Sequence, residues 1–413
     1  MRLLLLLLLC AALGTRADSL LSGGHLKGRL NYADFDDGSL FAELSDDTAF
    51  DQGADLRLKL RHDSGRWSAE GDYQFIGQFG DSLELAQALP GLIQRTDNVQ
   101  NDDRRALDLT HEISNNEDRA VIQRLDRLNL GYSSDQWVAR LGRQAVSWGN
   151  GLIYTPMDVF NPFDPAAVDT EYKSGDDMLY GQYLLDNGDD WQAVWIVRRD
   201  EDKNLDSEVN SLAFKYHGFR GELEYDLLLA EHYDDTIVGL GGSLPWGGAV
   251  LRADLTLTDT PDDEVVSGVA SWSYSWVGWG HNMSGALEYY YNGFGQENED
   301  YLPQQVQDNQ DLFVRLARGE LFTLARHYLA GSLLVEVTPL FQLTPNVFYN
   351  IEDQSLLAQI VASYDLAQEA QLLLALNLPV GSSGTEYGGF DSGIDGLEID
   401  YGSSVFAQLA WYF

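Results

Sequence analysis

The histidine, serine and cysteine residues of this chain form no pattern typical of a catalytic or metal site. Its seven histidines are scattered, and neither an H-E-x-x-H nor a G-x-S-x-G sequence occurs. The single cysteine, Cys10, lies in the N-terminal apolar run, so no thiol is left for a nucleophile or a disulfide further along the chain. Carboxylates are so numerous that any pair of them could look catalytic. We therefore predict no enzyme and no cofactor.

Charged residues are the remaining candidates for function, and acidic ones dominate. The chain holds 65 Asp and Glu against 26 Lys and Arg, a net charge of −39. Because proteins bind nucleic acid by neutralising phosphates with basic side chains, this composition argues against nucleic acid as a partner. Acidic clusters such as 34–37, 262–264 and 297–300 suit either solubility in a salty medium or Ca²⁺ and Mg²⁺ bridges to lipopolysaccharide, since hard cations favour grouped carboxylates.

The elements that must position these charges show a period of two. In 249–258, for example, Leu251 and Leu255 alternate with Arg252 and Asp254. This pattern indicates a strand with one apolar and one polar face. Such strands occur both in soluble sandwiches and in membrane barrels. The two ends of the chain favour the barrel.

The N-terminus has the pattern of a secretory signal peptide. Arg2 precedes the apolar run from Leu3 to Leu13, and small residues follow it up to Ala17. That run is too short to span a bilayer, which needs about 20 residues, and no later apolar run exceeds five residues. We expect cleavage after Ala17, which divides the chain into a signal peptide at 1–17 and a single barrel domain at 18–413.

The C-terminus is an amphipathic strand that ends in an aromatic residue. Val405, Leu409 and Trp411 lie on one face and Gln408 on the other, and the last residue is Phe413. This motif resembles the sorting signal read by the barrel-assembly machinery of the bacterial outer membrane. The resemblance implies that this machinery and outer-membrane lipid are partners of the chain, and that the outer membrane is its location.

Applied along the whole chain, the alternating pattern predicts an all-β fold, an antiparallel transmembrane barrel of about eighteen strands (16–18). The strands are expected at 23–33, 53–62, 65–77, 123–133, 136–143, 178–186, 190–199, 208–217, 220–231, 235–243, 248–258, 264–275, 280–292, 323–336, 340–350, 355–365, 367–378 and 400–413. An even number places both termini in the periplasm. The short connections are then periplasmic turns. The long external loops are expected at 34–52, 78–122, 144–177, 293–322 and 379–399.

A barrel this wide can hold an aqueous lumen unless loops fill it. The residues predicted to line this pore, from the polar faces of the strands, are Lys27, Arg29, Arg57, Lys59, Arg61, Arg127, Arg140, Glu222, Glu224, Asp226, Arg252 and Asp254. The first seven form a basic arc on the first five strands, and the acidic group from Glu222 to Asp226 stands across from it. We interpret this as a lateral field that offers anionic solutes a basic path. The alternative is that these charges pair with one another or with inserted loops.

The segment 142–177 contains three of the chain's ten prolines and several aromatic residues, which indicates an ordered loop. It reads Gly-Arg-Gln at the strand end, followed by Trp-Gly, then Asp and then Asn-Pro. This pattern resembles one found in porin-like proteobacterial outer-membrane barrels, including the alginate-export type and its uncharacterised relatives. The resemblance implies a loop that folds inward, on which the residues of interest are Arg143, Trp148, Asp158, Asn161 and Pro162. The acidity of the chain departs from an alginate carrier. The alternative is a lid that packs against the rim and touches no solute.

These observations favour a passive outer-membrane channel for small solutes, anionic ones included. Two other functions remain open: an export conduit for an anionic polymer, and a plugged structural or adhesive barrel without channel activity.

Overall fold

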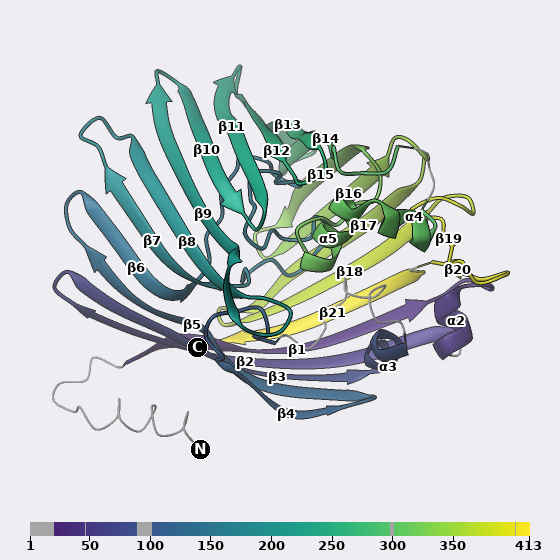
Figure 1. Ribbon diagram of the computed structural model, residues 1–413. Helices are drawn as coiled ribbons and strands as arrows, with labels where there is room; N and C mark the ends of the chain where they lie inside the picture. Colours follow the sequence, from purple (N-terminus) through teal and green to yellow (C-terminus); the bar gives the residue numbers. More distant parts are fainter. Residues whose placement is uncertain (1–19, 46, 89–100, 298–300, 401) are drawn as a thin grey trace.

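A computed structural model describes residues 20–45, 47–88, 101–297, 301–400 and 402–413. Within them eighteen antiparallel strands form a ring, which closes where β1 (Leu21–Asp34) pairs with β21 (Ser403–Tyr412) (Figure 1). The strands between them are β2 (Thr48–Ser64), β3 (Trp67–Gly80), β5 (Arg119–Ser133), β6 (Trp137–Gln144), β7 (Asp176–Leu184), β8 (Asp190–Arg199), β9 (Leu205–Arg220), β10 (Leu223–His232), β11 (Asp235–Trp246), β12 (Ala249–Asp259), β13 (Glu264–Gly278), β14 (His281–Tyr291), β15 (His327–Thr338), β16 (Phe341–Asn350), β17 (Leu356–Ala367) and β18 (Ala370–Val380). Each overlaps one predicted strand, so the predicted barrel is confirmed. The predicted signal peptide at 1–17 lies outside the described residues.

The apolar side of the strands faces outward. On β10 the buried residues Asp226 and Leu228 alternate with Leu227 and Leu229, which are 46% and 54% exposed. A soluble sandwich would bury its apolar side chains and expose its polar ones, whereas a barrel in lipid shows the arrangement seen here. The period of two that predicted the strands therefore also fixes which face contacts lipid.

The two ends of the barrel differ in the length of their connections. Short turns, such as Gly65-Arg66 and Gly221-Glu222, lie at the end where β1 begins and β21 ends. Both glycines have positive φ, 62° and 67°, which suits tight hairpin turns. Several exposed tryptophans lie beside these turns: Trp67, Trp137, Trp191, Trp246 and Trp411. They are placed as the aromatic girdle of a membrane interface.

The long connections at the other end contain elements that the alternating pattern did not predict. They are the helices α2 (Leu40–Ser45), α3 (Asp81–Ala88), α4 (Pro303–Asp308) and α5 (Gln310–Arg318), the small sheet of β19 (Phe390–Asp391) and β20 (Glu398–Ile399), and β4 (Thr110–Asn116). β4 pairs with the first residues of β5 and β6 with the last, so β4 continues the wall above β6. No helix among the described residues has the length and apolar character needed to cross a membrane.

The C-terminal residue takes part in closing the barrel. The backbone of Phe413 exchanges two hydrogen bonds with Gly24, at 2.8 and 3.1 Å. Glycine is required at position 24, because a Cβ there would lie 2.2 Å from the carbonyl oxygen of Arg57 and 2.8 Å from the ring of Phe413. The last residue is thus seated on the first strand.

Candidate functional site

Residues 145–175, called the inward segment from here on, join β6 to β7 and lie inside the barrel. Lys27 on β1, Asp254 on β12 and Gln359 on β17 each form a hydrogen bond to it, at 2.6, 2.6 and 2.8 Å. These strands stand on different sides of the ring, so the segment crosses the lumen.

The first half of the inward segment is attached by apolar packing. Trp148, Met157 and Phe160 are buried against the inward side chains of β7 to β11. The indole nitrogen of Trp148 also donates to Gln192 Oε1 at 2.8 Å. This half of the segment therefore fills the side of the lumen nearest to β7–β11.

Carboxylates on the facing strands hold the backbone of the same half. Asp254 accepts hydrogen bonds from the backbone N–H groups of Asn150 and Gly151, at 2.6 and 3.1 Å, and Asp226 accepts one from the Asn150 side chain at 3.0 Å. Glu288 on β14 accepts from the N–H groups of 152, 153 and 154 at 2.5 to 3.1 Å. The acidic wall opposite β1 thus bonds to the segment.

A buried ion pair joins the middle of the inward segment to its end, and a hydrogen bond from the same lysine reaches its beginning. Lys173 Nζ lies 2.6 Å from Asp158 Oδ1 and 2.7 Å from the carbonyl oxygen of Val146. Burial raises the pKa of Asp158 and lowers that of Lys173, although each partner opposes the effect on the other. Nearby, Asn161 donates to Asp176 at 2.9 Å, and Pro162 lines the smaller cavity described below.

Arg143 lies at the end of β6 and fastens a different loop. It donates to both oxygens of Asp177 at 3.0 Å, to Asp102 at 2.8 Å and to the carbonyl of Leu107 at 2.6 Å. Burial works to raise the pKa of Asp102, but Arg143 and Arg105 hold it below its usual value. Arg143 therefore attaches the loop at 101–109 to the mouth of the barrel.

The second half of the inward segment leaves open space beside β1, β2 and β3. An outer cavity of about 410 Å³ is lined on one side by Asp164 to Asp169 of the segment and on the other by Arg29, Gln52 and Gln78. An inner cavity of about 160 Å³ follows toward the short-turn end and shares Arg29, Gln78 and Asp169 with it. A third cavity of about 240 Å³ shares Asp164 and Asn377 with the outer one. The inner and the third cavity thus each adjoin the outer one.

Three members of the predicted basic arc, Lys27, Arg29 and Arg57, line these cavities, and most of the arc is paired. Arg57 contacts Asp126 at 2.6 Å and Asp72 at 3.3 Å, and Arg61 contacts Glu70 at 2.6 Å. The remaining members are placed as follows: Lys27 pairs with Asp169 and Glu171, Arg29 lines both cavities, Lys59 and Arg140 lie over the rings of Tyr172 and Tyr180, and Arg127 pairs with Asp126. Pairing with neighbours and with the inserted segment, the alternative interpretation, therefore applies to most of the arc.

Sequence reasoning missed Arg124 and Asp126, which also line the inner cavity. Arg124 is buried, donates to Gln74 at 2.9 Å and pairs with Asp126. A strict alternation that turns Arg127 inward turns both of these residues outward. The register of β5 shifts between Leu125 and Arg127, opposite Asp72 and Tyr73, so residues on both sides of the shift face the lumen.

The predicted residues of the opposite wall lie at different depths. Glu222 lies in the turn before β10 and is exposed, so it is not a wall residue. It keeps the inward parity of β10, but that strand begins at Leu223, three residues later than the pattern suggested. Glu224 is exposed at the rim beside Ser243, at 3.3 Å, and Arg252 donates to Ser273 at 2.8 Å.

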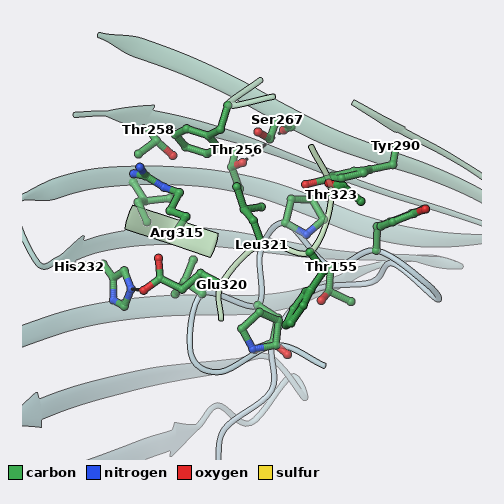
Figure 2. Close-up of a pocket in the computed structure, with 18 of the residues that line it drawn as sticks. Thr155, His232, Thr256, Thr258, Ser267, Tyr290, Arg315, Glu320, Leu321 and Thr323 are labelled. Atoms are coloured by element: carbon green, nitrogen blue, oxygen red, sulfur yellow. Dashed lines mark hydrogen bonds and ion pairs between the residues drawn. The ribbon is translucent and has the colours of Figure 1, made fainter. Parts of the chain in front are cut away.

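Figure 2 shows a smaller cavity of about 80 Å³ between the inward segment and the loop after α5. At its edge His232 bridges Ser211 Oγ, 2.8 Å from Nδ1, and Glu320 Oε1, 3.0 Å from Nε2. These are the residue types of a hydrolytic triad. However, Ser211 is 2% exposed, is not among the residues lining the cavity, and accepts a hydrogen bond from Arg198 at 2.5 Å. The array links β9, β10 and the loop after α5 rather than presenting a nucleophile.

No group of three or more histidine or acidic side chains in the described residues is arranged to hold a metal ion.

No family model and no curated protein matches the chain. Its structure resembles OccAB1 of Acinetobacter baumannii, with a TM-score of 0.50 and 12% identity, covering 96% of this chain and 98% of that one. OccAB4 of the same organism gives 0.49 and 9%, over 96% of this chain and 100% of that one, and a Rh. blastica porin variant gives 0.45 and 9%, over 95% and 99%. The chain has the fold of a porin-like outer-membrane barrel. The resemblance to alginate-export barrels stays a prediction.

Proposed function

We propose that this chain is a passive outer-membrane channel for small solutes, with a preference for anions. The observation that carries the proposal is the pair of adjoining cavities between the second half of the inward segment and the wall of β1, β2 and β3. A third cavity adjoins the outer one on the side of β16, β17 and β18. The first half of the segment is packed against the opposite wall, so solutes would pass on the polar side. Export by the predicted signal peptide would deliver the protein to this membrane.

The charge of the inner cavity supports the preference for anions. Its lining holds Lys27, Arg29, Arg57 and Arg124 against three aspartates, so it has a small excess of positive charge in a chain whose net charge is −39. Walls of low dielectric focus the field in such a narrow space. Most acidic side chains of the opposite wall bond to the inward segment, so they do not face a solute. We therefore propose a basic path on one side of the lumen. We do not propose the lateral field between a basic and an acidic wall.

Planar-bilayer recording tests this function. Purified protein should give steady ohmic steps, and reversal potentials in a KCl gradient should favour chloride. Replacing Lys59 and Arg61 by Gln should shift the reversal potential toward that of potassium. Both residues belong to the basic arc and are only partly buried. A matched control replaces Arg104 and Lys203, exposed cations of the external loops, by Gln.

Three results would count against the proposal. A selectivity for cations that the Lys59 and Arg61 replacements leave unchanged would contradict the anion preference. Absence of steady current would favour the plugged barrel. Block of the current from one side by an anionic polymer, without passage of small anions, would favour the export conduit.

A further inference from the structure

The end of the inward segment places carboxylates and an aromatic ring against cationic side chains of β1 and β2. Lys27 Nζ contacts Asp169 Oδ2 at 2.6 Å and Glu171 Oε2 at 2.8 Å. Glu171 also accepts a hydrogen bond from the hydroxyl of Tyr412 at 3.0 Å. The bond to Lys27 lowers the pKa of both carboxyl groups against the effect of burial. The ammonium group of Lys27 therefore forms ion pairs with two ionised carboxylates.

The ring of Tyr172, the next residue, covers the neighbouring cations. Its centroid lies 4.0 Å from Arg57 Cζ, 4.8 Å from Lys59 Nζ and 5.6 Å from Lys27 Nζ. All three distances are within the range of about 6 Å in which a cation is attracted to the face of a ring. One aromatic ring thus makes cation–π contacts with three cationic side chains.

Residues 169–172, called the arm from here on, are held differently from the first half of the inward segment. None of the residues from 161 to 172 is fully buried, whereas Trp148, Met157 and Phe160 are. The arm contacts the strands through ion pairs, a hydrogen bond and cation–π contacts. Segments with few buried apolar contacts are the ones that open at low cost in free energy. The arm is therefore the part of the inward segment that a competitor could displace.

We infer that the arm is a tethered occupant of a binding site for small aromatic carboxylates, formed by Lys27 and Arg57 of the inner cavity and by Lys59 beside the Tyr172 ring. Glu171 and Tyr172 present a carboxylate and a ring to these cations. A free molecule that carries both groups satisfies the same contacts and displaces the arm. The inference rests on the proposed channel function and names a class of solute for it. It makes Tyr172 an internal competitor of the solute.

Isothermal titration calorimetry of the detergent-solubilised protein with sodium phenylacetate tests the inference. Because the arm competes with the ligand, Tyr172→Ala should bind phenylacetate about tenfold more tightly than the unaltered protein, a change of about 1.4 kcal/mol. Tyr172→Phe keeps the ring and should bind like the unaltered protein. Cyclohexylacetate has a similar size and charge but no π system, and should bind several-fold more weakly than phenylacetate.

Weaker or unchanged binding by Tyr172→Ala overturns the inference, since it would make the ring part of the site or irrelevant to it. Equal binding of the two acids overturns it as well. Heat-modifiable mobility on gels verifies that each variant is folded. If Tyr172→Ala does not fold, Glu171→Gln, which removes a competing carboxylate, is expected to tighten binding in the same direction.

The titration does not depend on conduction. Binding as described together with an absence of ohmic current would contradict the proposed function and leave the inference intact. Steady anion-selective current without phenylacetate binding would do the reverse.

Discussion

Lys173 Nζ lies 2.6 and 2.7 Å from the two carboxylate oxygens of Asp158, fifteen residues earlier in the chain. The pair is buried inside the barrel, and the same ammonium group reaches the carbonyl of Val146. It therefore closes the inward segment on itself. Much of the shape of the lumen depends on whether this segment keeps its position.

Removing one member of this pair should be more harmful than removing both. Asp158→Leu or Lys173→Met alone leaves a buried charge without its partner, which costs about 3–5 kcal/mol. The double replacement should recover a large part of that loss. The temperature at which the folded gel band disappears measures the order of the three variants. Additive losses in the double variant would mean that the two residues are not coupled.

Glu288 should control the attachment of residues 152–154. Its carboxylate accepts three backbone N–H groups and the hydroxyl of Ser271, and a glutamine offers only one acceptor oxygen. Glu288→Gln should therefore speed hydrogen exchange at these three amides, because each lost bond to a charged group is worth about 1.5–3 kcal/mol. Glu224→Gln, at the exposed rim, is the control and should leave their exchange unchanged.

The loop at 101–109 should be released by acid. Arg143 and Arg105 lower the pKa of Asp102, so the attachment is fully present above the ordinary value of 3.8 and is lost as the pH falls through the lower, folded-state pKa. A nitroxide at Asp103→Cys, a neighbouring exposed position, reports the motion of the loop. Its mobility should be constant from pH 7 to about pH 4 and should rise below that. Asp102→Asn should be mobile at every pH.

Phe413 should govern assembly more than stability. The residue is 51% exposed, while its hydrogen bonds with Gly24 run through the backbone and survive a change of side chain. If the barrel-assembly machinery reads the terminal aromatic residue, Phe413→Ala will lower the amount of folded protein in outer-membrane fractions and leave its thermal midpoint almost unchanged. A large fall in that midpoint with normal assembly would contradict this. Leu366→Ala, an exposed position near another turn, is the control.

The signal-peptide prediction can be examined by mass. Cleavage after Ala17 gives a mature chain that begins at Asp18, and the intact mass of protein purified from membranes will identify this end directly. Retention of Cys10 with a bound lipid would contradict the prediction.

The strands could be predicted from the sequence because each strand of a membrane barrel has two different surroundings. Lipid on one side and a polar interior on the other impose a period of two, as in Leu227 and Leu229 against Asp226. All eighteen strands follow from that local rule, and so do their lipid faces outside the register shift in β5. The inward parity of Lys27, Arg57 and Asp254 follows from it too. The ends of the strands are less well defined by the pattern, and β2 begins five residues earlier than predicted.

The tertiary structure decided everything that depends on distant partners. The shift in β5 that turns both Arg124 and Asp126 inward has no local pattern to announce it. Nor does alternation reveal that Gln359 meets Ala166 across 193 residues, or that Asp226 and Asp254 hold a loop rather than face open water. A periodic sequence fixes on which side of its own strand a charge lies. Whether that charge meets a solute or another part of the chain depends on where a loop folds, and only the assembled barrel determines this.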